Sequence, residues 1–174
     1  ALDTMLIMGL EDEADKTREE IVRDLRFDQD IEVKNFEITI RILGGLLSSH
    51  QMTGDKRLLA MAEDLGTRLL PVFDSPTGMP YMFVNLKTGK TRGALSNPAE
   101  IGTLVLEFGT LAKLTGKEVF FTNCGMVSAS NVDHWSLRSD DRWLRAVWSA
   151  LETDAGDLTT CGSDTPSGDT LIAL

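Results

Sequence analysis

The sequence has little of several features that identify a class of protein at once. No run approaches the roughly 20 apolar residues of a membrane-spanning helix, so we expect no membrane segment in this chain. Lysine and arginine total 17 against 27 aspartates and glutamates, giving a net charge of −10. Phosphate binding needs clustered basic side chains, so this balance argues against a nucleic-acid partner.

Cysteine and histidine are scarce too. The two cysteines, Cys124 and Cys161, have no metal-type spacing and define no redox compartment, so we assign them no role. His50 is interpreted as an exposed histidine at a helix end. No cluster of His, Asp or Glu has the spacing of a metal site, and the residues themselves therefore predict none.

What the sequence does contain is a strongly apolar helical stretch, NFEITIRILGGLLSSH, over residues 35–50. Apolar residues recur along it with the period of an α-helix, which predicts a helix inside a protein. One core-facing stripe consists of Phe36, Ile40, Leu43 and Leu47, and a second of Ile38 and Ile42.

A third stripe of this helix is not apolar, and it consists of Glu37, Arg41, Gly44 and Ser48. Something other than hydrophobic packing must therefore face it. Gly44 and Gly45 each cost about 1 kcal/mol relative to alanine, which predicts close approach by another backbone or a ligand. Glu37 and Arg41 fit either a buried ion pair that satisfies itself or an acid catalyst beside an arginine, and spacing does not decide.

The helices recur in pairs. The segments 52–59 and 114–121 share a helix, Thr-Gly, helix pattern, with Gly54 as a left-handed cap and Asp55 as the next N-cap. Such hairpins predict a helical array, either an open solenoid or a closed ring. Between them, residues 75–92 are rich in proline and glycine, which favours a β-hairpin or an irregular loop.

Several motifs resemble one known family in its own order: ALDTMLIMGL, FEITIRILGGLLSSH, TGDKRLLAMAEDLGTRLLPVFDSPTGMPY, VNLKTG and AEIGTLVLEFGTLAKLTG. Together they resemble the N-terminal part of glycoside hydrolase family 47, the class I α-1,2-mannosidases, over about residues 1–121. The resemblance implies an all-α fold, a partial (αα)7 barrel with a β-hairpin-like insertion near 75–92. VNLKTG and LEFGTLAKLTG also resemble the degradation-enhancing branch of the endoplasmic reticulum, without separating the branches.

The resemblance also implies roles for four residues. Glu37 matches the general acid of an inverting glycosidase, and Arg41 matches the arginine that orients this acid and contacts sugar. Glu100 and Glu107 match glutamates that line the sugar pocket. The residues alone favour helix capping for Glu100, behind Asn97, whereas Glu107 lies inside an otherwise apolar run.

The family's calcium ion is held partly by a threonine near its C-terminus, and neither this threonine nor the catalytic base has a match here. We therefore expect a fragment that is inactive alone, derived from an enzyme that trims high-mannose oligosaccharides or glycoproteins in the ER or Golgi. We recognise no targeting signal in these residues and expect any such signal to lie upstream of them. A partial barrel would expose apolar faces, which predicts aggregation.

Residues 122–174 show no such resemblance. We expect them to form a largely disordered tail that is not homologous to the family. Our hypothesis is that this tail comes from a shifted reading frame or a misjoined gene segment. The rival to the mannosidase interpretation is a non-enzymatic α-helical repeat module that binds protein partners. It predicts exposed charges along a concave face in place of acids buried in apolar helix walls.

Overall fold

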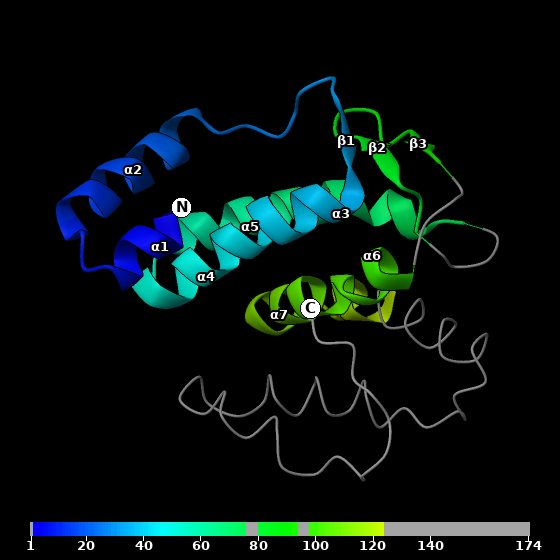
Figure 1. The fold of residues 1–174 in the computed structure, drawn as a ribbon. Helices are drawn as coiled ribbons and strands as arrows, with labels where there is room; N and C mark the ends of the chain where they lie inside the picture. The colour runs from blue at the N-terminus through cyan, green and yellow to red at the C-terminus, as the bar shows by residue number, and fades with distance from the viewer. Residues whose placement is uncertain (1, 76–79, 94–97, 124–174) are drawn as a thin grey trace, which may run out of the picture.

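A computed structural model of the chain describes residues 2–75, 80–93 and 98–123, and most of these residues are helical (Figure 1). The helices are α1 (Leu2–Ile7), α2 (Glu11–Asp24), α3 (Asn35–Ile38), α4 (Gly44–Thr53), α5 (Lys56–Leu69), α6 (Pro98–Gly102) and α7 (Leu104–Thr115). A π-helical turn, η1 (Thr39–Leu43), joins α3 to α4, and a 3₁₀ turn, η2 (Leu70–Phe73), follows α5. Three short strands complete the fold: β1 (Glu32–Lys34), β2 (Phe83–Asn85) and β3 (Thr91–Arg92).

Three left-handed glycines end three of the helices. Gly9, Gly54 and Gly116 have φ values of 73°, 71° and 70°, a region that glycine enters without steric cost. The predicted cap at Gly54 and the predicted helix end at Thr115-Gly116 are confirmed. The predicted hairpin of α4 and α5 is confirmed too, since the two helices pack against each other. The helix predicted from residue 98 is interrupted at Thr103 into α6 and α7.

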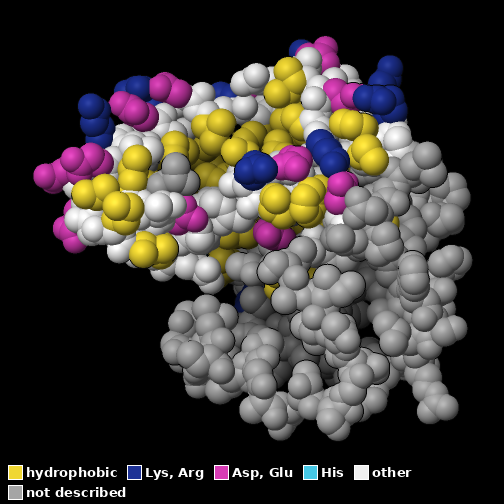
Figure 2. All heavy atoms as spheres, in the orientation of Figure 1, with side chains coloured by type: hydrophobic (Ala, Val, Ile, Leu, Met, Phe, Trp, Pro, Cys, Tyr) yellow, Lys and Arg dark blue, Asp and Glu magenta, His cyan; other side chains and the backbone are white. Residues whose placement is uncertain are grey.

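The central helix packs differently from its predicted stripes. Leu43 and Leu47 are buried, but Ile42 is 37% exposed and Phe36 only half-buried. The backbone N–H of Gly44 donates to the carbonyl of Thr39, five residues back. This π-helical turn takes up an extra residue, so the α-helical period does not hold across it. On one face of the molecule, hydrophobic side chains are exposed at the surface among charged ones (Figure 2).

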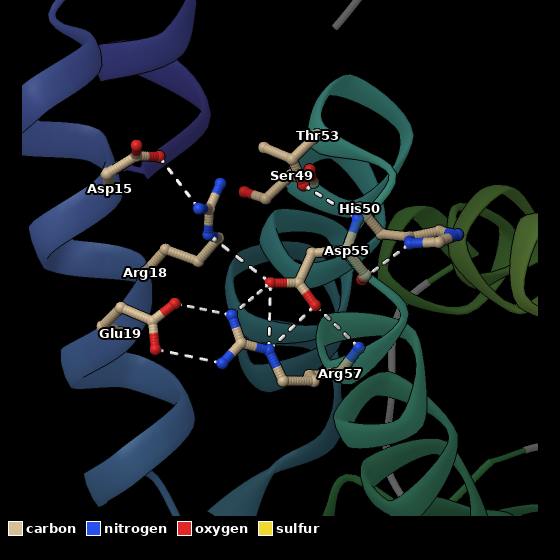
Figure 3. Close-up of polar contacts among 8 residues, drawn as sticks. All are labelled: Asp15, Arg18, Glu19, Ser49, His50, Thr53, Asp55 and Arg57. Carbon is tan, nitrogen blue, oxygen red and sulfur yellow. Dashed lines mark hydrogen bonds and ion pairs between the residues drawn. The ribbon is translucent and has the colours of Figure 1, made fainter.

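Asp55 joins the turn between α4 and α5 to helix α2 (Figure 3). Its side chain accepts from the backbone N–H of Arg57 at 2.9 Å, which confirms the predicted N-cap. The Arg57 guanidinium lies 2.7 Å from Asp55 Oδ2 and 2.6 Å from Glu19 Oε1 on α2. His50 is half-buried with Nδ1 2.9 Å from the Asp55 carbonyl, so its expected exposure at the helix end is wrong.

The three strands form an antiparallel sheet in the order β1-β2-β3, beside the start of α3 (Figure 1). The hairpin predicted near 75–92 is confirmed by the pairing of β2 with β3. β1 adds a third strand, with Val33 opposite Val84. Among the described residues no helix is both long and apolar enough to cross a membrane. The predictions for Asn97, for both cysteines and for the tail from residue 124 lie outside the described residues.

Candidate functional site

Acidic side chains from two of the neighbouring helices, α1 and α7, face the polar stripe of the central helix. Ser48 Oγ donates to Asp3 Oδ2 of α1 at 3.2 Å. On α7, Cγ and Oε1 of Glu107 would lie 3.6 Å and 3.8 Å from a Cβ atom added at Gly44. Gly44 therefore faces an acidic side chain at ordinary van der Waals distance, where close approach by another backbone or a ligand is predicted. At Gly45 an added Cβ would meet no atom within 4 Å, so no other backbone among the described residues approaches it, and approach by a ligand stays a prediction.

Sequence reasoning missed Asp3. The signal was present, because an acid followed by threonine interrupts the otherwise apolar stretch ALDTMLIMGL. The role of Asp3 depends on its hydrogen bond with Ser48, which lies 45 residues later in the chain. Only the packing of α1 against α4 brings the two side chains together.

Glu37 and Arg41 form an ion pair at the start of the central helix. Arg41 Nε lies 2.6 Å from Glu37 Oε2, and the two side chains are 70% and 42% exposed respectively. The interpretation as a buried pair is therefore wrong. Exposed i,i+4 pairs contribute only about 0.3–0.5 kcal/mol, so this contact orients the carboxylate more than it stabilises the fold. Arg41 belongs to the π-helical turn, a feature that is frequent at functional sites.

Glu107 has the opposite environment. Burial raises the pKa of its carboxyl above the ordinary value of 4.5, although its own backbone N–H opposes the rise. Its Oε2 atom is buried and has no hydrogen-bond partner among the described residues. A carboxyl that favours its neutral form inside an apolar wall can hold a proton or donate a hydrogen bond. This group is thus chemically distinct from the exposed Glu37.

Glu100, in the first turn of α6, contacts a lysine far away in the sequence. Lys34 Nζ lies 2.7 Å from Glu100 Oε1, and the two side chains are 32% and 18% exposed respectively. Simple helix capping, the preferred interpretation from the sequence, does not describe this contact. Glu100 also lines a cavity of about 10 Å³ with Asn35 and Tyr81, a space for about one water molecule and too small for a sugar ring.

A larger hollow of about 380 Å³ lies elsewhere, between the segment 25–28 and helix α5. None of the predicted site residues lines it. Its Arg68 is already bonded to Asp64 and to the Leu86 carbonyl. The acids around the central helix are therefore the better candidate for chemistry.

The metal implied by the family resemblance does not fit the described residues. Within 2–75, 80–93 and 98–123, no group of three or more His, Cys, Asp or Glu side chains could hold a metal ion. The acids of the site are divided among several helices, and Glu37 and Glu100 each have a basic partner. No catalytic step is therefore derived through calcium.

Comparisons with known proteins match the chain to one family. The family model "Glycosyl hydrolase family 47" matches residues 1–151, and so continues past residue 121 into part of the predicted tail. The chain is 44% identical over 124 residues to the human endoplasmic reticulum mannosyl-oligosaccharide 1,2-alpha-mannosidase, covering 69% of this chain and 18% of that protein. It is 39% identical to the human ER degradation-enhancing alpha-mannosidase-like protein 2, covering 80% of this chain and 26% of that one.

The same similarity appears in three dimensions. The solved α-1,2-mannosidase from Trichoderma reesei matches with a TM-score of 0.67 and 30% identity, covering 75% of this chain and 30% of that chain. The predicted all-α fold, part of an α/α barrel, is thereby confirmed. The chain spans only about a fifth to a quarter of the curated relatives it matches, from 18% to 26%.

Proposed function

The chain belongs to glycosyl hydrolase family 47, and on that premise we propose that it provides the general-acid side of an α-1,2-mannosidase site. The substrate class would be high-mannose oligosaccharides, since the relatives are named mannosyl-oligosaccharide 1,2-alpha-mannosidases. The observation that carries the proposal is the polar stripe on the central helix, which faces Asp3 of one neighbouring helix and Glu107 of the other.

In this proposal Glu37 protonates the glycosidic oxygen as the leaving group departs. A positioned general acid contributes typically about 10²- to 10⁴-fold to the rate. Arg41, 2.6 Å from the carboxylate, holds it in one orientation. Inversion also requires a second carboxylate to activate water on the opposite face of the sugar. We assign that base, and any calcium ligand, to residues that have no match in this chain.

Glu100 and Glu107 are proposed to line the sugar site, where Glu107 supplies a half-buried carboxyl whose pKa is raised by burial. With the base unmatched, the chain alone would lack differential binding of the transition state, so we propose that it is inactive by itself. Two of its relatives, both human, are named for the endoplasmic reticulum, which supports a place in the secretory pathway.

One observation favours the rival interpretation, a repeat module that binds proteins. Glu37 and Arg41 are exposed, as that interpretation predicts for its charges. Glu107 argues against it, because a binding surface gains nothing from a carboxyl oxygen, Oε2, that is buried without a hydrogen-bond partner among the described residues. Family membership argues against it as well.

A segment exchange tests the proposal. Residues 2–121 would replace the matching segment of the human endoplasmic reticulum mannosidase, and release of mannose from a Manα1,2-Man oligosaccharide would be measured. We expect an active exchange protein, with no turnover by the 174-residue chain alone. A protein that unfolds cooperatively but is inactive would contradict the proposal, and turnover by the chain alone would contradict its inactivity.

A further inference from the structure

Lys34 ends strand β1 and immediately precedes the helix that carries Glu37. Its backbone is held on both sides. Strand pairing places Lys34 opposite Phe83, and the Asn35 N–H donates to the Met82 carbonyl at 2.8 Å. Asn35 itself is only 3% exposed. The base of the Lys34 side chain is therefore fixed relative to the first turn of α3.

From this fixed base the lysine reaches Glu100, 66 residues further along the chain, at 2.7 Å. Its ammonium also lies 5.9 Å from the centre of the Phe36 ring. The Lys34 and Glu100 side chains are both less exposed than those of Glu37 and Arg41. A charged hydrogen bond is shorter and stronger than a neutral one, and salt screens it less when it is partly buried.

Helix α6, which carries Glu100, needs such an external contact. It has five residues and ends where Thr103 interrupts the helix. A helix this short is not stable by its own hydrogen bonds. Ile101, 8% exposed, anchors it through the core, and the Lys34 contact anchors it to the sheet and the start of α3.

We propose that Lys34 is a positioning residue of the sugar site. Its ammonium holds the Glu100 carboxylate in place relative to Glu37, so that one mannose-terminated oligosaccharide meets the acceptor oxygens of Glu100 and the proton-donating carboxyl of Glu37 at a fixed separation. The inference rests on the proposed function, because it takes Glu37 and Glu100 as groups of one site. Lys34 acts on the sugar through Glu100.

The positioning can be measured without a sugar. In the ¹³C-labelled 174-residue chain, the carboxyl NMR signal of Glu100 and the amide exchange of residues 99–102 would be followed. We expect Lys34→Met to shift the signal and speed the exchange, Lys34→Arg to restore both, and the exposed control Lys90→Met to change neither. A Glu100 signal that is the same in Lys34→Met and the wild type would overturn the proposal.

The consequence for binding is measured by titrating the same chains with the disaccharide Manα1,2-Man. We expect Lys34→Met to weaken the Kd by about tenfold, as for the loss of one charged hydrogen bond, and Lys34→Arg to recover most of the affinity. Equal weakening in both variants would overturn the role of the positive charge. If the wild-type chain does not bind, the sugar role of Glu100 in this chain is refuted, whereas the segment exchange decides the proposed function separately.

Discussion

At the scale of single residues, the site contains carboxyl groups in different environments. Glu37 is paired with arginine and its side chain is 42% exposed, whereas Glu107 is half-buried and its buried Oε2 has no hydrogen-bond partner among the described residues. Acids whose surroundings differ in this way can take different roles in one reaction. Spacing along the helix left open a buried ion pair at Glu37, and the structure gives this side chain 42% exposure. Glu107, which the sequence places inside an apolar run, is half-buried.

Glu107 makes stability depend on pH. Burial raises its pKa in the folded chain above 4.5, so just above pH 4.5 the folded chain keeps a proton that the unfolded chain releases. The contribution of Glu107 to the free energy of unfolding is therefore fully present at low pH, and it is lost as the pH rises through the raised pKa. We expect Glu107→Gln to remove this fall, so that the variant gains stability relative to the wild type between pH 4.5 and pH 7 in urea titrations.

The exposed Glu118→Gln is the control for this comparison, since Glu118 is at the surface of the same part of the chain. The free energy of unfolding of this variant should equal that of the wild type throughout the urea titrations. A constant difference between Glu107→Gln and the wild type across the range would show that the Glu107 pKa is the same in both states.

At the scale of elements, Asp55 in the turn between α4 and α5 does more than cap a helix. It also pairs with Arg57, which contacts Glu19 on α2. Asp55→Ala should lower the free energy of unfolding by about 1–2 kcal/mol, the range for loss of an N-cap. Asp64→Ala is the matched control, with a half-exposed side chain 3.0 Å from Arg68, and should cost only about 0.2–0.5 kcal/mol. Equal losses in denaturant titrations would contradict this account.

Helix α5 approaches α7 closely at Gly66. A Cβ there would overlap the buried Leu111 Cδ2 and lie 3.3 Å from Phe120 Cε1. We expect Gly66→Ala to destabilise the chain by about 1–3 kcal/mol through overpacking. Gly45→Ala, in an open part of α4, should instead stabilise it by up to about 1 kcal/mol. Thermal unfolding of both variants checks the sign of each change.

The elements predictable from sequence are those whose signals lie within a few residues. Gly54 and Asp55 form one turn, and their cap geometry follows from their own side chains. The π-helical turn left no such signal, so the predicted burial of Ile42 is wrong. The contact of Lys34 with Glu100 joins residues 66 apart, and only the docking of α6 near β1 creates it.

At the scale of the whole molecule, the chain forms part of a barrel and leaves apolar side chains open. Leu106 on α7 is 54% exposed and Ile42 is 37% exposed. We expect the isolated chain to self-associate and to bind apolar dyes. Leu106→Lys should reduce association in sedimentation velocity while changing the free energy of unfolding by less than about 0.5 kcal/mol.

The control for this variant is Leu111→Lys, at a position with no exposure. It should unfold the chain, because it buries an unpaired charge. A monomeric wild-type chain that unfolds in one sharp transition and binds no dye would contradict the open-barrel description.

The central claim is that Glu37 is the proton donor of a mannosidase site. Its most direct test is kcat for mannose release by the exchange protein that carries residues 2–121, compared with the same protein bearing Glu37→Gln. We predict a loss of at least about 10²-fold, the contribution of a general acid, whereas Glu20→Gln on the exposed face of α2 leaves kcat unchanged. An unchanged kcat in Glu37→Gln would contradict the account.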